Sequence, residues 1–162
     1  MQKAEGPEGK KALVLALKDA SALVRSTAEF CVPVKCSNDA DCKMEAVRTE
    51  RKRLLDSGAE DRSSAITILQ LLYDPQALNT ESNKLILSTW LDLANDRDEN
   101  IRRQAVSRAY DSVMRSQSKP DLTRLKLDNK AKIIQRLKLD ADASKGKFSK
   151  KAEALARRLQ SR

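Results

Sequence analysis

Three cysteines, Cys31, Cys36 and Cys42, lie within twelve residues of one another, and the chain contains no other cysteine. Zinc binding by thiolates would need a fourth ligand and a more familiar spacing than C-x4-C-x5-C. A local disulfide is the more attractive interpretation, because Cys31 near the end of one helix and Cys42 at the start of the next could join the two helices. Cys36 could pair with either of them. The remaining interpretation is three reduced cysteines that act as small apolar side chains.

The state of the cysteines bears on where the protein is found. A bridge would imply an oxidising compartment or an organelle lumen, whereas reduced cysteines would fit the cytoplasm, the nucleus or an organelle matrix.

The residue types that enzymes need are mostly missing. The chain has no histidine, which removes the usual general base, the commonest metal ligand, and any Ser–His or Cys–His nucleophile pair. The sequence Lys145-Gly146-Lys147 is not a glycine-rich phosphate loop. Closely spaced aspartates lie in predicted turns, where they more often cap helices than bind metal: Asp39/Asp41, Asp96/Asp98 and Asp140/Asp142. We expect no catalytic residues, no metal site and no cofactor, and hence not an enzyme.

The positive charge is concentrated at the C-terminal end. Residues 121–162 hold 13 Lys and Arg against five Asp and Glu, a net charge of +8, whereas residues 1–120 hold 19 against 18. This asymmetry predicts a neutral α-helical body over 8–117 and a basic helical C-terminal segment over 121–162 that can meet an anionic partner. The candidate contacts are Lys126, Lys130, Lys132, Arg136, Lys138, Lys145, Lys147, Lys150, Lys151, Arg157 and Arg158.

The elements that carry these residues are expected to be helices only. Glycine and proline number four each, and long stretches of helix-forming residues with apolar positions three and four apart separate them. No run of 18 apolar residues is present, so no transmembrane segment is expected. The expected helices run from 8 or 9 to 30 with Pro33 as a stop, from about 39 to 56, 61 to 74, 80 to 94, 99 to 115, 129 to 139, and onward from 149.

A short pattern recurs along the chain. The sequence Val24-Arg25-Ser26-Thr27-Ala28 has a counterpart in Ile101-Arg102-Arg103-Gln104-Ala105, and a weaker third copy is Asp61-Arg62-Ser63-Ser64-Ala65. The arginines are 37 and 40 residues apart, which is a typical period for helical repeats.

Acidic residues precede the two stronger copies of this pattern. Asp19 precedes Arg25, and Asp98 precedes Arg102. An aspartate in a turn between two helices can accept a hydrogen bond from an arginine on the second helix, and an alanine on that helix permits close packing.

With this pattern the chain resembles a HEAT-type α-solenoid over about half its length. The stretch Leu87–Tyr110 resembles one helix pair of such a repeat, and Leu13–Glu29 resembles the turn region of another. The expected fold is therefore all-α, either an antiparallel helical bundle or a short HEAT-like array of five helices, followed by the basic helical segment.

These features favour a non-enzymatic structural or adaptor subunit of a larger assembly, which binds protein partners through helical faces and the basic tail. The alternative is a nucleic-acid-binding protein that uses the Lys- and Arg-rich segment. Peripheral contact of that segment with an anionic membrane is a further alternative.

Overall fold

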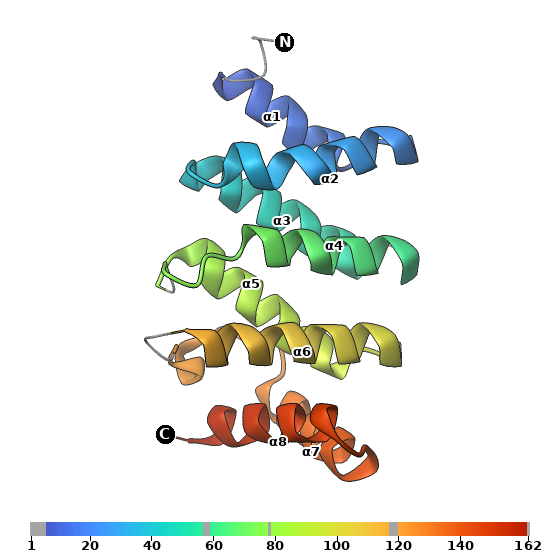
Figure 1. The fold of residues 1–162 in the computed structure, drawn as a ribbon, viewed down its shortest axis with the longest axis vertical. Coiled ribbons are helices and arrows are strands. Elements are labelled where there is room, and N and C mark those ends of the chain that lie inside the picture. The colour runs from blue at the N-terminus through green and yellow to red at the C-terminus, as the bar shows by residue number, and fades with distance from the viewer. Residues whose placement is uncertain (1–5, 57–58, 78, 117–119, 162) are drawn as a thin grey trace. The chain divides into compact units, whose positions relative to one another are not determined.

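A computed structural model describes residues 6–56, 59–77, 79–116 and 120–161, and over these residues it contains helices and turns but no strand (Figure 1). The prediction of an all-α fold is confirmed. None of the described helices is both long and apolar enough to cross a membrane.

The chain divides into two compact units, Met1–Tyr73 and Asp74–Arg162, which are called unit 1 and unit 2 below. This division differs from the expected one between 117 and 121, a boundary that falls partly outside the described residues. The basic segment 121–162 is part of unit 2 and does not stand apart from the preceding helices.

Unit 1 consists of two helix pairs. Its helices are α1 (Pro7–Ala16), α2 (Ala22–Cys36), α3 (Ala40–Asp56) and α4 (Ala59–Leu72). Helix α1 packs on α2 and α3 packs on α4, and between the pairs α1 contacts α3 while α2 contacts α4 (Figure 1). The core is aliphatic, and its fully buried members include Leu17, Ala28, Val32, Val47, Leu54, Ile66 and Leu69.

The predicted single helix from 8 or 9 to 30 is wrong, because the chain turns between Ala16 and Ala22. Leu17 is fully buried at the end of α1, so the turn begins with an apolar anchor in the core and not with a glycine or proline.

Pro33 does not stop α2, which continues through it to Cys36. Proline has no N–H group, so the carbonyl of Glu29 loses its partner within the helix. Val32, Pro33 and Cys36 are all buried, and their packing in the core offsets that loss.

Unit 2 repeats the arrangement of unit 1. Its elements are α5 (Glu81–Asp92), the 3-10 turn η2 (Leu93–Asn95), α6 (Glu99–Arg115), the 3-10 turn η3 (Leu122–Arg124), α7 (Lys130–Ala143) and α8 (Lys147–Gln160). Helix α5 packs on α6 and α7 on α8, and between these pairs α5 contacts α7 while α6 contacts α8. The bounds predicted for α6 are confirmed.

The basic segment folds into unit 2 because its two helices are amphipathic. Helix α8 buries Ala152, Leu155, Ala156 and Leu159, which recur at intervals of three, one and three residues, and it leaves most of its lysines and arginines off that face. Burying this apolar face against α6 and α7 removes it from water, which is favourable regardless of the net charge of the segment.

Asn83 organises the connection that leads into α5. This side chain is 1% exposed. Its Nδ2 donates to the carbonyl oxygens of Asp74 at 2.6 Å and Ala77 at 2.8 Å. Its Oδ1 accepts from the N–H of Asp74 at 3.2 Å. One buried amide therefore satisfies three main-chain groups in a segment that has no helical partners of its own.

Replacing Asn83 with alanine removes these three bonds and is expected to lower the free energy of unfolding of unit 2 by about 2 kcal/mol. The single tryptophan, Trp90, is fully buried in unit 2, so its fluorescence during urea unfolding reports on this unit. The exposed Asn100→Ala on α6 serves as the control and should change stability by less than about 0.5 kcal/mol. Equal effects of the two substitutions would contradict the anchoring role of Asn83.

Candidate interaction surfaces

Two arginines bind the turns between paired helices in the same way. In unit 1, Arg25 Nη1 donates to the carbonyl oxygens of Asp19 at 2.8 Å and Ala20 at 2.9 Å. In unit 2, Arg102 Nη1 donates to the carbonyl oxygens of Asp96 at 3.1 Å and Arg97 at 3.2 Å. In both cases the acceptors lie six and five residues before the arginine, so the two turns have the same register.

Main-chain carbonyls make these contacts, whereas the sequence predicted aspartate side chains as acceptors. Asp98 has a different role, because its Oδ1 accepts from the N–H groups of Asn100 and Ile101 and caps α6. Asp96 is the true counterpart of Asp19, and each lies six residues before its arginine. Asp19 Oδ1 accepts from the N–H two residues later at 2.8 Å, and Asp96 Oδ1 does the same at 2.9 Å. The interval of six residues was the signal that could have identified Asp96.

The third copy of the pattern makes a related contact. Arg62 Nε donates to the carbonyl oxygen of Leu54 at 2.7 Å, near the end of α3. Arg25, Arg62 and Arg102 are each the fourth residue of the second helix of a pair. The recurrence seen in the sequence therefore corresponds to a recurring hydrogen bond from an arginine of the second helix to a main-chain carbonyl of the segment that precedes that helix.

Arg102 also joins the two helix pairs of unit 2. Its Nε lies 3.4 Å from Oδ2 of Asp140 on α7, and Nε of Arg136 lies 3.2 Å from the other oxygen of the same carboxylate. Arg102 and Asp140 are 7% and 8% exposed, so removing one partner would leave the other charge in a poorly hydrated site.

Unit 1 holds a comparable buried ionic cluster. Arg53 of α3 donates to Glu50 at 3.0 and 2.9 Å and to Glu29 of α2 at 2.7 Å, and Ser64 of α4 donates to the other oxygen of Glu29 at 2.8 Å. Burial lowers the pKa of the Arg53 guanidinium, but Glu50 and Glu29 outweigh it, so the pKa is raised above its ordinary value. The cluster joins α2, α3 and α4.

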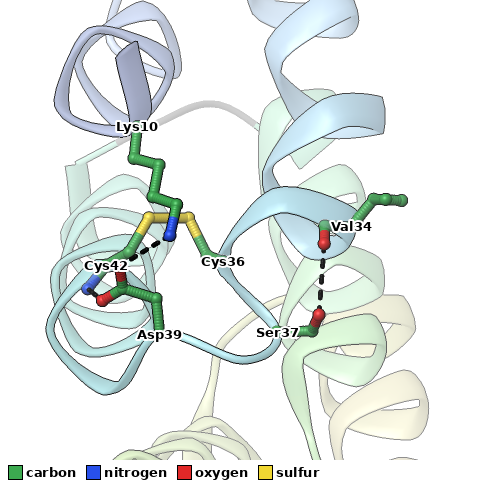
Figure 2. The surroundings of a disulfide bond; sticks show 6 residues. All are labelled: Lys10, Val34, Cys36, Ser37, Asp39 and Cys42. Carbon is green, nitrogen blue, oxygen red and sulfur yellow. Dashed lines mark hydrogen bonds and ion pairs between the residues drawn. A yellow bond between two sulfur atoms is a disulfide. The ribbon is translucent and has the colours of Figure 1, made fainter. Parts of the chain in front are cut away.

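Cys36 and Cys42 form a disulfide across the turn between α2 and α3 (Figure 2). Cys31 is half-buried and has a free thiol. The pairing of Cys31 with Cys42 is therefore not observed, because α2 extends one turn and more beyond Cys31 and brings Cys36 to the start of α3 instead.

The same turn is held by Asp39, whose predicted capping role is confirmed. Its Oδ1 accepts from the N–H of Cys42 at 2.9 Å, and its Oδ2 binds Lys10 Nζ of α1 at 2.8 Å (Figure 2). The bond from the Cys42 N–H and the contact with Lys10 hold the pKa of Asp39 below its ordinary value of 3.8. The stabilising contribution is therefore complete above the ordinary pKa and is lost as pH falls through the lower folded-state pKa.

The described residues contain no group of three or more His, Cys, Asp or Glu that could hold a metal ion.

Four of the predicted anionic-partner contacts bind within unit 2. Lys151 pairs with Asp111 at 3.0 Å, Arg136 with Asp140, and Arg157 with Glu153 at 2.6 Å, while Arg158 Nη2 donates to the carbonyl of Pro120 at 3.5 Å. Lys126 acts on Glu81, whose pKa is lowered first by Lys84 and to a smaller extent by Lys126. The others have no ion pair to any residue that the structure describes: Lys130, Lys132, Lys138, Lys145, Lys147 and Lys150.

The exposed face of α8 carries a basic stripe that consists of Lys147, Lys150 and Arg157. With the half-buried Ala154 these positions follow intervals of three, four and three residues, so they lie on one face of the helix. All three charged side chains are exposed.

The exposed face of α2 carries an apolar stripe that consists of Leu23, Thr27, Phe30 and Val34. Leu23, Phe30 and Val34 are 76%, 81% and 69% exposed. Their intervals of four, three and four residues again define one helix face, which is opposite to the buried face formed by Ala28, Val32 and Cys36.

No family model, curated protein or solved structure matches this chain.

Replacing Arg102 with alanine should lower the free energy of unfolding of unit 2 by about 3 kcal/mol, because it removes a buried charge that binds a carboxylate and two carbonyls. The neighbouring Arg103 is the matched control. It is exposed, pairs with Glu99 at 2.7 Å and lies over the Phe148 ring at 4.8 Å. Arg103→Ala should therefore cost only about 1 kcal/mol. Urea unfolding followed by Trp90 fluorescence compares the two variants. A smaller loss of unfolding free energy for Arg102→Ala than for Arg103→Ala would refute the stabilising role of Arg102.

The disulfide predicts that the denatured, unreduced protein has one reactive thiol, from Cys31, and that reduction yields three. Closing so short a loop should stabilise the fold by about 2 kcal/mol in the chain-entropy account. Cys42→Ser should show two thiols and reduced stability, whereas Cys31→Ser should show none and unchanged stability. Three thiols in the unreduced wild-type protein would rule out the bridge.

Proposed function

We propose that this protein is a non-enzymatic adaptor that binds a helix of a partner protein on the apolar stripe of α2. The exposure of Leu23, Phe30 and Val34 on one helix face is the observation that carries the proposal. Single exposed apolar residues are ordinary on protein surfaces, but three large ones on the same helix face are typical of a binding site.

The spacing of the stripe suits a helical ligand. Side chains at intervals of three and four residues form the kind of seam that an amphipathic helix packs against, with its own anchors at the same intervals. Phe30 is the largest side chain of the stripe and is the expected centre of the contact, because aromatic anchors contribute strongly to such interfaces.

The construction of the units supports an adaptor role. Each unit stacks two helix pairs. The hydrogen bond from an arginine to a carbonyl of the preceding turn recurs at the same position in α2 and α6. These features are similar to those of a HEAT-type α-solenoid, and we propose that the chain is a short array of this kind. Helical arrays offer extended surfaces to partner proteins and need no catalytic groups.

The test is sedimentation of the tagged protein in a gentle native extract, with and without nuclease. The wild-type protein is expected in a heavy fraction that resists nuclease. Phe30→Glu should move it to the position of the free 18.1 kDa chain, because a charge cannot be buried in an apolar seam.

The matched control is Leu139→Glu, which alters a side chain of α7 that is 53% exposed and lies outside the stripe. It should leave the heavy fraction unchanged. A wild-type protein that sediments as the free chain in both runs would refute the adaptor role, and equal effects of the two variants would refute the assignment to α2.

A further inference from the structure

Unit 2 presents a surface of a different kind from the apolar stripe. It holds 20 Lys and Arg against 12 Asp and Glu, a net charge of +8, whereas unit 1 holds 12 against 11. The charge of unit 2 is not spread evenly, because several of its cations bind acidic partners or carbonyls of the same unit. The basic stripe of α8 is a place where exposed cations remain aligned.

The stripe has a length and composition suited to a polyanion. Ten residues separate Lys147 from Arg157, which corresponds to about 15 Å along the helix axis. Double-stranded DNA carries about nine phosphate charges over the same distance. Lys147 and Lys150 have no ion pair to the described residues. Arg157 pairs with Glu153 at 2.6 Å, but both side chains are largely exposed, so the pair is weak and a phosphate can compete for the guanidinium.

The stripe lacks the anchors that a protein partner would use. The exposed side chains of α8 are Lys, Glu, Arg and Gln, whereas the centre of a protein–protein interface is depleted in charge and needs an apolar or aromatic anchor. Phosphate contacts need only cations and hydrogen-bond donors. The composition therefore favours a phosphate backbone over an acidic protein.

Two aromatic rings lie near the stripe, but cations cover them. The Arg103 guanidinium lies 4.8 Å from the ring centre of Phe148, and Lys151 Nζ lies 5.5 Å from that of Tyr110. The ring face that already binds a cation is not free to stack on a base, which is how many single-strand binders hold nucleic acid. Binding without stacking and without base-reading groups would be independent of sequence.

We propose that the basic stripe of α8 binds the phosphate backbone of nucleic acid without reading its sequence. This activity goes beyond the adaptor function and does not depend on it, because the apolar stripe belongs to unit 1. Together they would let one chain bind a protein partner and a nucleic acid.

The test measures binding of the purified full chain to two fluorescent 20-bp DNA duplexes of unrelated sequence by anisotropy. Both duplexes are expected to bind with the same affinity. The slope of log K against log salt should lie near −3, since about three phosphates are neutralised. A preference of more than tenfold for one duplex would overturn the claim of sequence independence, and no binding at about 50 mM salt would overturn the proposal itself.

Lys147→Gln/Lys150→Gln should reduce the magnitude of the salt slope by about two and lower the affinity about tenfold. The control Lys132→Gln/Lys138→Gln removes the same charge from exposed positions on α7 and should change affinity less than threefold. Equal losses for both variants would overturn the assignment to α8. Trp90 fluorescence verifies that each variant is folded.

Two further measurements distinguish this proposal from binding of an acidic protein and from the adaptor proposal. Poly-glutamate of matched charge should compete weakly, and competition as strong as that of DNA would show that the stripe binds acidic protein instead. Phe30→Glu should bind DNA as the wild-type protein does, so a failure of the adaptor proposal leaves the DNA result interpretable.

Discussion

The contact between an arginine and the carbonyl oxygens of the preceding turn fixes the geometry of the first helix pair in each unit, α1 with α2 and α5 with α6. Arg25 and Arg102 donate to two successive carbonyls that have no helical partners, because they lie after one helix has ended and before the next begins. A guanidinium can satisfy both at once owing to its fork of donors. The turn therefore keeps a fixed shape without glycine or proline, and the helices it joins keep a fixed relation.

Buried ion pairs then set how one helix pair packs on the next within each unit. Arg102 and Asp140 join α6 to α7, and Arg53 and Glu29 join α3 to α2. Aliphatic side chains alone would allow several similar packings, because dispersion forces have little directional preference. A charge that must meet its partner favours one register, which is the role best attested for buried ionic groups.

The two units place different chemistry on their exposed helix faces. In unit 1 the core-facing side of α2 consists of the buried Ala28, Val32 and Cys36, and the opposite, exposed side is also apolar. In unit 2 the core-facing side of α8 is equally apolar, but its exposed side is basic. Because a helix that packs on a core needs only one apolar face, the composition of its exposed face can vary, and it is apolar on α2 and basic on α8.

The sequence by itself determined that the chain is helical, and it placed α6 and the capping role of Asp39, because helix formers, apolar periodicity and caps act within a few residues. It also revealed the recurrence of arginine at the same position in α2, α4 and α6. Only the tertiary structure decided the turn after Ala16, the passage of α2 through Pro33 and the pairing of Cys36 with Cys42. Burial decided these features, since packing against distant residues can offset a local preference worth about 3 kcal/mol. The same holds for the surfaces, because only the fold shows that Phe30 is exposed on the outer face of α2.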